Sequence, residues 1–194
     1  MNLENASATA IFIHIKKHML YYWYRVIWIL IARRFQTQIN IEDELTRSFH
    51  VRLFDCDGFR VMTAFKYAAY MDFVRWELIA RSKLYDEILP KGLAPSLGSQ
   101  KIIYRKPLKL WTKFTVRLKT MGWDEKWVYH VHKFEQNGEV KAVGITRALI
   151  WKKDKPQILR QILQNISVKN LDQKPPEWIT NLFQTDTNII QDKF

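Results

Sequence analysis

The segment from Thr63 to Leu84 contains neither glycine nor proline and carries apolar residues around most of a helical circumference. Phe65, Phe73 and Trp76 recur at helical spacing along one stripe, and neighbouring apolar residues widen that stripe. A helix that is apolar on nearly every side has to be enclosed by other elements. The sequence therefore predicts one long buried helix with a sheet around it.

Alternating apolar and polar residues lie on both sides of this helix. Residues 49–54 alternate and predict a strand that leads into the helix. Residues 85–98 contain several prolines and glycines and predict a loop. Four further strands are predicted at residues 101–105, 113–121, 126–134 and 140–151, with Asn137-Gly138 as the hairpin turn between the last two. This order predicts an α+β fold with an antiparallel sheet wrapped around the helix.

Length and composition suit one domain with extensions. The chain has 194 residues, of which 47% are hydrophobic, which is enough for a substantial core. Its one cysteine, Cys56, permits no intramolecular disulfide and lies between two aspartates that disfavour its thiolate, so we expect it to pack rather than react. We expect three parts: a membrane-facing helical extension and linker at residues 1–45, the main domain at 46–153, and a helical extension at 154–194.

The N-terminal segment from residue 11 to residue 35 combines apolar, aromatic and basic residues. Its apolar run at residues 26–32 is too short to span a bilayer, which takes about 20 apolar residues. Tyrosine and tryptophan beside lysine and arginine favour an interfacial helix on an anionic membrane. The alternative is a helix that packs on the main domain or on a partner subunit. Both interpretations fit the sequence.

The net charge of +12 calls for an anionic partner. The basic residues are spread along the chain without a nucleic-acid-binding motif, so we expect no nucleic-acid partner. A membrane surface or a phosphorylated ligand such as coenzyme A fits better. We expect a cytoplasmic protein, with peripheral contact at the inner face of a membrane if residues 11–35 bind lipid.

The junction between the first strand and the long helix is the predicted site of chemistry. Asp55 and Asp57 stand just before a glycine turn, and Thr63 is the expected N-cap of the helix. A helix N-terminus offers unpaired backbone N–H groups and partial positive charge, which can hold a developing oxyanion while a nearby carboxylate attacks or activates water.

This junction resembles the active-site segment of the hotdog-fold acyl-CoA thioesterases, in particular the 4-hydroxybenzoyl-CoA thioesterase type. The resemblance starts from Asp57 and Tyr67, ten residues apart with the helix opening between them. Three further stretches are similar to the branch called thioesterase superfamily member six: Tyr67–Arg75, Tyr104–Leu108 and Gly122–Trp127. The resemblance implies a hotdog fold, in which an antiparallel sheet wraps a central helix.

The resemblance also implies an activity. The expected reaction is hydrolysis of a fatty or aromatic acyl thioester of CoA or acyl-carrier protein, with Asp57 as nucleophile or general base and the Ala64 backbone N–H polarising the carbonyl. No cofactor is implied beyond the CoA of the substrate, and the expected assembly is a homodimer or a higher homo-oligomer. The residues assigned to the site are Asp57, Thr63 and Ala64 for catalysis, and Arg60, Tyr67, Arg105 and Lys106 for substrate binding.

One departure keeps a second function open. Members of that branch carry His-Met-Asn-Asn before the helix, whereas this chain has Val61-Met62-Thr63-Ala64. The alternative is a noncatalytic acyl-thioester-binding or membrane-associated scaffolding protein with a degenerate hotdog site. A metal site is not expected, because His130 and His132 share one face of a strand without a recognisable third ligand.

Overall fold

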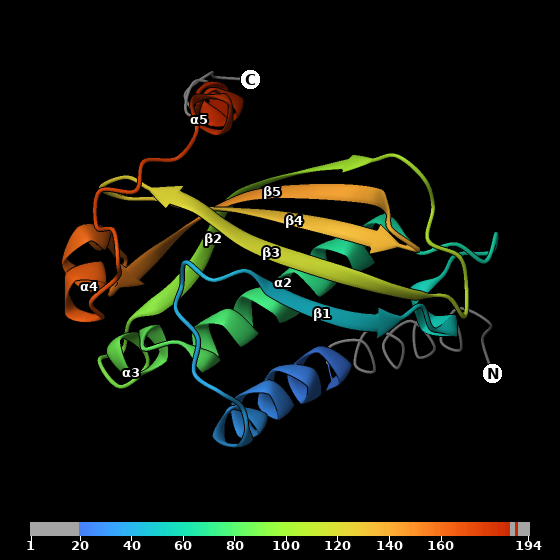
Figure 1. The fold of residues 1–194 in the computed structure, drawn as a ribbon, viewed down its shortest axis with the longest axis horizontal. Coiled ribbons are helices and arrows are strands. Elements are labelled where there is room, and N and C mark those ends of the chain that lie inside the picture. Colours follow the sequence, from blue (N-terminus) through green and yellow to red (C-terminus); the bar gives the residue numbers. More distant parts are fainter. Residues whose placement is uncertain (1–19, 187–188, 190–194) are drawn as a thin grey trace, which may run out of the picture.

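The computed structural model describes residues 20–186 and 189, and its centre is helix α2 (Ala64–Arg81) in the hollow of a curled sheet (Figure 1). The six strands of the described residues are all antiparallel, in the order β1-β3-β4-β5-β2, with β6 beside β5. Their bounds are Leu45–His50 (β1), Ala94–Tyr104 (β2), Lys113–Trp123 (β3), Val128–Gln136 (β4), Glu139–Lys152 (β5) and Lys155–Pro156 (β6). The predicted α+β class, with a sheet around one long helix, is confirmed.

The buried face of α2 differs from the predicted stripe. Tyr67, Met71, Val74 and Leu78 are buried against the sheet, whereas Phe65 is 58% exposed. Phe65 lies in the first turn of α2. Gly144 of β5 allows a close approach, because a Cβ there would collide with the Met71 side chain.

The strand before the helix ends earlier than predicted. β1 stops at His50, and residues Leu53–Asp55 form the short 3-10 helix η2. The Asp55 carboxylate accepts a hydrogen bond from the Arg52 N–H at 2.9 Å, and the Asp55 N–H donates to the Arg52 carbonyl at the same distance. These two bonds turn the chain, so Leu53 and Phe54 do not continue the alternation.

The predicted loop at residues 85–98 is wrong over most of its length. Helix α3 (Leu84–Ile88) follows α2, and β2 already begins at Ala94. Pro95 is tolerated because β2 is an edge strand, where one N–H row needs no partner. Gly98 stands at a register shift against β5 and leaves room for the Trp127 ring. Two of the four residues that suggested a loop are therefore accommodated within a strand, and the other two, Pro90 and Gly92, lie between α3 and β2.

Within the described residues, helices α4 and α5 follow the sheet. Helix α4 (Leu159–Asn165) buries Leu159 and Leu163 in the main core. Helix α5 (Glu177–Phe183) packs Ile179 and Phe183 on the convex face of the sheet, opposite α2 (Figure 1). The division of the chain at residues 45 and 153 stays a prediction.

The N-terminal helix lies along the open side of α2 (Figure 1), and several apolar side chains of this helix are exposed. Its described part, residues 20–32, ends in the 3-10 turn η1 (Arg33–Phe35). The inner face places Tyr22 against Phe73, with ring centroids 5.5 Å apart, and buries Val26. The predicted packing on the main domain is thus found for residues 20–35, while residues 11–19 lie outside the described range. Within residues 20–186, every helix is too short or too polar to cross a bilayer.

Candidate active site

Asp57 lies in a tight turn between η2 and α2. Its Oδ1 accepts a hydrogen bond from the Phe59 N–H at 2.9 Å, and its own N–H donates to the Val61 carbonyl at 3.0 Å. The side chain is exposed, and the turn is held by isolated bridges from Cys56 to Met62 and from Val61 to Lys109. A carboxylate is therefore fixed at the surface, next to the start of the long helix.

The neighbouring Asp55 is buried and fully paired. Its carboxylate lies 3.1 Å from the Lys66 ammonium and accepts a hydrogen bond from the Tyr70 hydroxyl at 2.8 Å. Burial, followed by the charge of Asp55, strongly raises the pKa of Tyr70, so this hydroxyl stays protonated and keeps donating. These contacts fasten the turn that carries Asp57 to the first two turns of α2.

Thr63 occupies the N-cap position of α2, as predicted, but its hydroxyl does not cap the helix. The hydroxyl donates to the Asp55 carbonyl at 3.2 Å, and the backbone N–H of Thr63 donates to the same oxygen at 2.9 Å. The first N–H groups of a helix have no intrahelical acceptor. The N–H of Ala64 is the first of these.

A cavity of about 290 Å³ opens at this helix start. Tyr67 lies at its base. The Tyr67 hydroxyl accepts a hydrogen bond from the Leu108 N–H at 3.4 Å, and the ring packs edge-on against Tyr104 with centroids 5.1 Å apart. Burial raises the pKa of the Tyr67 phenol. The lining residues are Met62, Ala64, Tyr67, Tyr104, Arg105, Lys106 and Pro107.

The basic residues at the mouth of this cavity share one acidic partner. Glu139 lies 2.5 Å from the Lys106 ammonium and 3.8 Å from the Arg105 guanidinium. Hydrogen bonds from Lys106 and Lys141 lower the pKa of Glu139 to about 2. Both Arg105 and Lys106 are exposed, so a phosphate can reach them by displacing a solvated carboxylate.

The structure thus brings four of the predicted site residues together and leaves three outside the cavity lining. Ala64, Tyr67, Arg105 and Lys106 line the cavity, but Asp57, Arg60 and Thr63 do not. Arg60 is exposed and has a positive φ of 61°, as part of the turn. Sequence reasoning did not single out Tyr104, which also lines the cavity, although this residue begins one of the stretches on which the resemblance rests.

Among the described residues, Cys56, His130 and His132 do not form a further reactive centre. Burial raises the pKa of the Cys56 thiol, and the charges of Asp55 and Asp57 raise it further. His130 and His132 are buried with ring centroids 6.3 Å apart. Across residues 20–186, no three metal-ligating side chains gather at one point.

A family model described as the thioesterase-like superfamily matches residues 51–178, a span that contains the turn, α2 and strands β2 to β6. The chain belongs to this superfamily. It is a thioesterase-like protein with a cavity at the N-terminus of the central helix.

Among curated proteins, the chain is similar to those named Protein THEM6. The fruit fly protein (Drosophila melanogaster) is 22% identical over 176 residues, covering 89% of this chain and 91% of its own length. The zebrafish protein (Danio rerio) is 24% identical over 164 residues, covering 82% and 81%. The predicted resemblance to this branch is confirmed.

Solved structures confirm the hotdog fold. The gentisyl-coenzyme A thioesterase BH1999 aligns with a TM-score of 0.53 at 18% identity, covering 62% of this chain and all of that one. YbaW, a probable thioesterase from Escherichia coli, gives 0.57 at 18% identity, covering 63% and 98%. SAV2348 from Staphylococcus aureus, solved in complex with CoA, gives 0.58 at 14% identity, covering 72% and 91%.

Proposed function

We propose that the chain hydrolyses acyl-CoA thioesters at the start of α2, with Asp57 as nucleophile or general base. The observation that carries this proposal is the cavity in which the helix N-terminus at Ala64 meets the basic residues Arg105 and Lys106. A thioester carbonyl at this position would meet an N–H donor on one side and the CoA phosphates would meet cations on the other. Membership of the thioesterase-like superfamily supports the reaction class.

The chemistry needs little from the protein. A thioester carbonyl is electrophilic, so a held carboxylate and one oxyanion donor are sufficient for catalysis, and such a donor contributes about 100- to 1,000-fold in rate. The turn hydrogen bonds of Asp57 leave its second carboxylate oxygen available. Tyr67, Tyr104 and Met62 offer an apolar and aromatic wall, which suits a fatty or an aromatic acyl group.

Association with a second copy of the chain would bring Asp57 and the cavity closer together. The sheet order leaves β2 as an 11-residue edge strand with an unpaired row of backbone groups. Exposed apolar side chains, among them Ile103 and Tyr104, stand on this strand beside the cavity. Pairing of two β2 edges would join two sheets into one and enclose the cavity between protomers, where Asp57 of one copy can complete it.

The test is free-thiol release from acetyl-, palmitoyl- and benzoyl-CoA. Asp57→Asn keeps the oxygen that accepts the turn hydrogen bond but removes the charge, so we expect turnover to fall at least about 100-fold with folding intact. The matched control is Asp154→Asn, an exposed turn aspartate with φ 62°, a conformation that asparagine tolerates. Unchanged turnover in Asp57→Asn would remove this residue from the mechanism.

The noncatalytic alternative rests on the same junction. Val61-Met62-Thr63-Ala64 supplies no imidazole or amide beside the helix start, and Asp57 already serves the turn. If no CoA thioester is turned over while acyl-CoA still binds, the chain is an acyl-thioester-binding protein. Acyl-carrier thioesters belong in the same assay, because Arg105 and Lys106 would meet the phosphate of either carrier.

We further propose that the outer face of the N-terminal helix lies on an anionic membrane surface. Seven exposed apolar residues follow one another at helical spacing along this face: Leu20, Trp23, Tyr24, Ile27, Trp28, Ile31 and Phe35. Tryptophan and tyrosine favour the headgroup region, and the net charge of +12 complements anionic lipid. A protein partner would not require this excess of positive charge.

Vesicle sedimentation tests the membrane contact. The full chain should bind phosphatidylserine vesicles more strongly than phosphatidylcholine vesicles, and added salt should weaken the binding. Replacing Trp28 and Ile31 by glutamate should abolish it. A matched control replaces Trp178 and Ile158, which are similarly exposed elsewhere, by glutamate. Equal binding of both variants would refute a contact through this face.

A further inference from the structure

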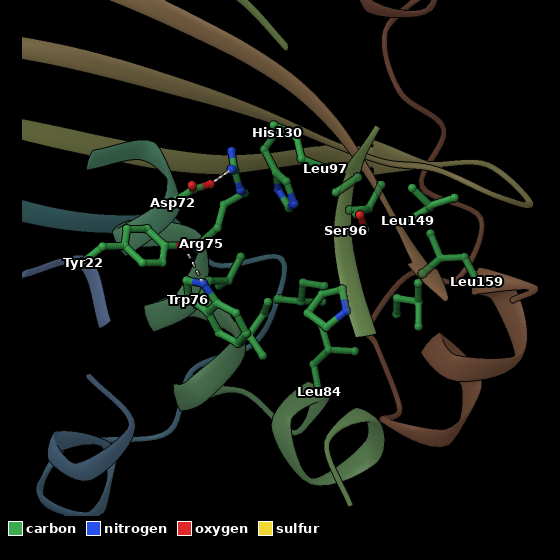
Figure 2. A pocket seen from close by; sticks show the side chains of 17 residues that line it. Tyr22, Asp72, Arg75, Trp76, Leu84, Ser96, Leu97, His130, Leu149 and Leu159 are labelled. Atoms are coloured by element: carbon green, nitrogen blue, oxygen red, sulfur yellow. Dashed lines mark hydrogen bonds and ion pairs between the residues drawn. The ribbon is translucent and has the colours of Figure 1, made fainter. Parts of the chain in front are cut away.

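A second cavity, of about 280 Å³, lies between α2 and the sheet at the other end of the helix (Figure 2). Arg75 is eleven residues beyond Ala64, which corresponds to about 16 Å along the helix axis at 1.5 Å per residue. The two cavities share no lining residue. This cavity is therefore separate from the proposed active site.

The second cavity has a polar end and an apolar end. Asp72, Arg75 and His130 lie together on one side, whereas Leu84, Leu97, Leu149 and Leu159 line the other (Figure 2). The strand register aligns His130 with Thr120 of β3 and Thr146 of β5, so a polar row crosses the sheet beneath α2. Polar groups in a core require an explanation when they lack partners.

Arg75 provides a buried hydrogen-bond donor. Its Nη2 is paired with Asp72, but its Nη1 is buried and has no hydrogen-bond partner within the part of the chain that the structure describes. The ion pair with Asp72 makes this end of the cavity neutral overall. A permanent anion in the cavity would leave one negative charge uncompensated, which burial makes costly.

His130 provides a hydrogen-bond acceptor. The Thr120 hydroxyl donates its proton to the Ile41 carbonyl at 2.6 Å, so its oxygen can only accept from His130 Nδ1, which lies 3.3 Å away. His130 is therefore the Nδ1–H tautomer, and its Nε2 carries a lone pair. Burial, and then the charge of Arg75, lower the pKa of this imidazole to about 3, so it is neutral.

We propose that this cavity binds a medium-length aliphatic molecule whose head group is neutral and both accepts and donates one hydrogen bond: a carboxylic acid in its protonated form or a primary alcohol. The head oxygen accepts from Arg75 Nη1, and the head O–H donates to His130 Nε2. The chain lies along the four leucines. The volume is at the lower limit of ligand pockets, about 300 Å³, and is too small for a whole CoA thioester. The proposal does not depend on thioester hydrolysis.

The two head groups differ in their proton balance. An acid is ionised in neutral solution, so its binding takes up one proton, shared between the carboxyl oxygen and His130 Nε2. The other titratable groups at this end keep their state: Asp72 and Arg75 of α2 are paired, His132 of β4 is neutral, and Tyr22 of the N-terminal helix is a phenol. Acid affinity should then fall about tenfold for each pH unit above the acid's pKa, and alcohol affinity should not change.

Calorimetric titration of the full chain with decanol, decanoic acid and decane, each below its aggregation limit, tests the site. We expect one bound decanol or decanoic acid per chain and at least about tenfold weaker binding of decane, which has no head group. Decanoic acid should bind about 100-fold more weakly at pH 8 than at pH 6. Acid binding without this pH dependence would overturn the neutral head group, and no binding of either compound would overturn the site.

Variants locate the ligand. Leu97→Trp places a larger ring in the apolar end and should weaken decanol binding at least about tenfold. Ile103→Trp is the matched control, because Ile103 lies on the same strand, is exposed and does not line the cavity. His130→Phe should reduce decanol affinity to that of decane. If Leu97→Trp is folded, as judged by circular dichroism, and still binds decanol as well as the native chain does, the ligand lies elsewhere.

Discussion

Replacement of Asp55 by asparagine tests how the candidate active site is held in place. The Asp55 carboxylate faces Lys66 at 3.1 Å, accepts from Tyr70 at 2.8 Å and accepts from the Arg52 N–H at 2.9 Å. Both members of the ion pair are almost completely buried, with side chains 4% and 6% exposed. Asparagine keeps the shape and an acceptor oxygen but leaves the Lys66 ammonium without its counter-charge.

The expected loss in the free energy of unfolding is large. Breaking a buried ion pair by removal of one partner costs about 3–5 kcal/mol, because a buried charge is left uncompensated. Folded domains are stable by only about 5–15 kcal/mol. We therefore expect Asp55→Asn to lower the free energy of unfolding by about 3 kcal/mol in urea denaturation, with the slope of the transition unchanged. Asp154→Asn, at an exposed turn, should change it by less than about 0.5 kcal/mol.

A second substitution separates the effect of the lost charge on stability from the effect of the changed side-chain shape. Lys66→Met in the Asp55→Asn background removes the unpaired ammonium and should restore most of the lost stability, since replacing both partners of a buried pair is often neutral. A loss below about 1 kcal/mol for Asp55→Asn alone would refute the argument from an uncompensated charge. So would a double variant as unstable as the sum of the two single variants.

Two further predictions concern the pH dependence of stability and the close contact between Gly122 and the backbone near Pro175. His130 and His132 are neutral in the fold with lowered pKa values, whereas in the unfolded chain they bind protons below about pH 6.5. The free energy of unfolding should therefore be highest above that pH and fall by about 1.4 kcal/mol per pH unit for each histidine on acidification. Urea midpoints that are flat from pH 7 to pH 5 would contradict this. Gly122→Ala should cost at least about 2 kcal/mol in thermal unfolding, because Gly122 has φ +137° and a Cβ there would lie 2.6 Å from the Pro175 nitrogen, whereas Gly58→Ala, with open space around it, should be nearly neutral.

The sequence was sufficient for the elements whose pattern is local. Helix α2 begins one residue after the predicted start, and both ends of β3, β4 and β5 lie within two residues of the predicted strand ends. The early part of β2 was not predictable from local signals. Pro95 fits in this strand because β2 lies at the edge of the sheet, and Gly98 fits because the Trp127 ring packs against it. The end of β1 depends on the Asp55 side chain, which the alternation of apolar residues does not reveal.

The candidate site divides in the same way. The resemblance selected Ala64, Tyr67, Arg105 and Lys106, and the fold brings their stretches together at one cavity; their roles in catalysis and substrate binding stay predictions. The second cavity could not be predicted, because it requires the register that sets His130 beside Thr120 and the position of Arg75 above them. No sequence pattern predicts that a buried donor such as Arg75 Nη1 lacks a hydrogen-bond partner among the described residues.

The position of α5 on the convex face has a consequence for biosynthesis. Tyr129, Val131 and Ile145 are buried there in one cluster with Ile179 and Phe183 of α5. On the ribosome, the strands that carry the first three residues emerge well before the helix that covers them. A nascent chain therefore holds a nearly complete sheet with a bare apolar face for some seconds, at about 5–20 residues per second. Chaperone demand during synthesis should depend on this interval more than on the core around α2.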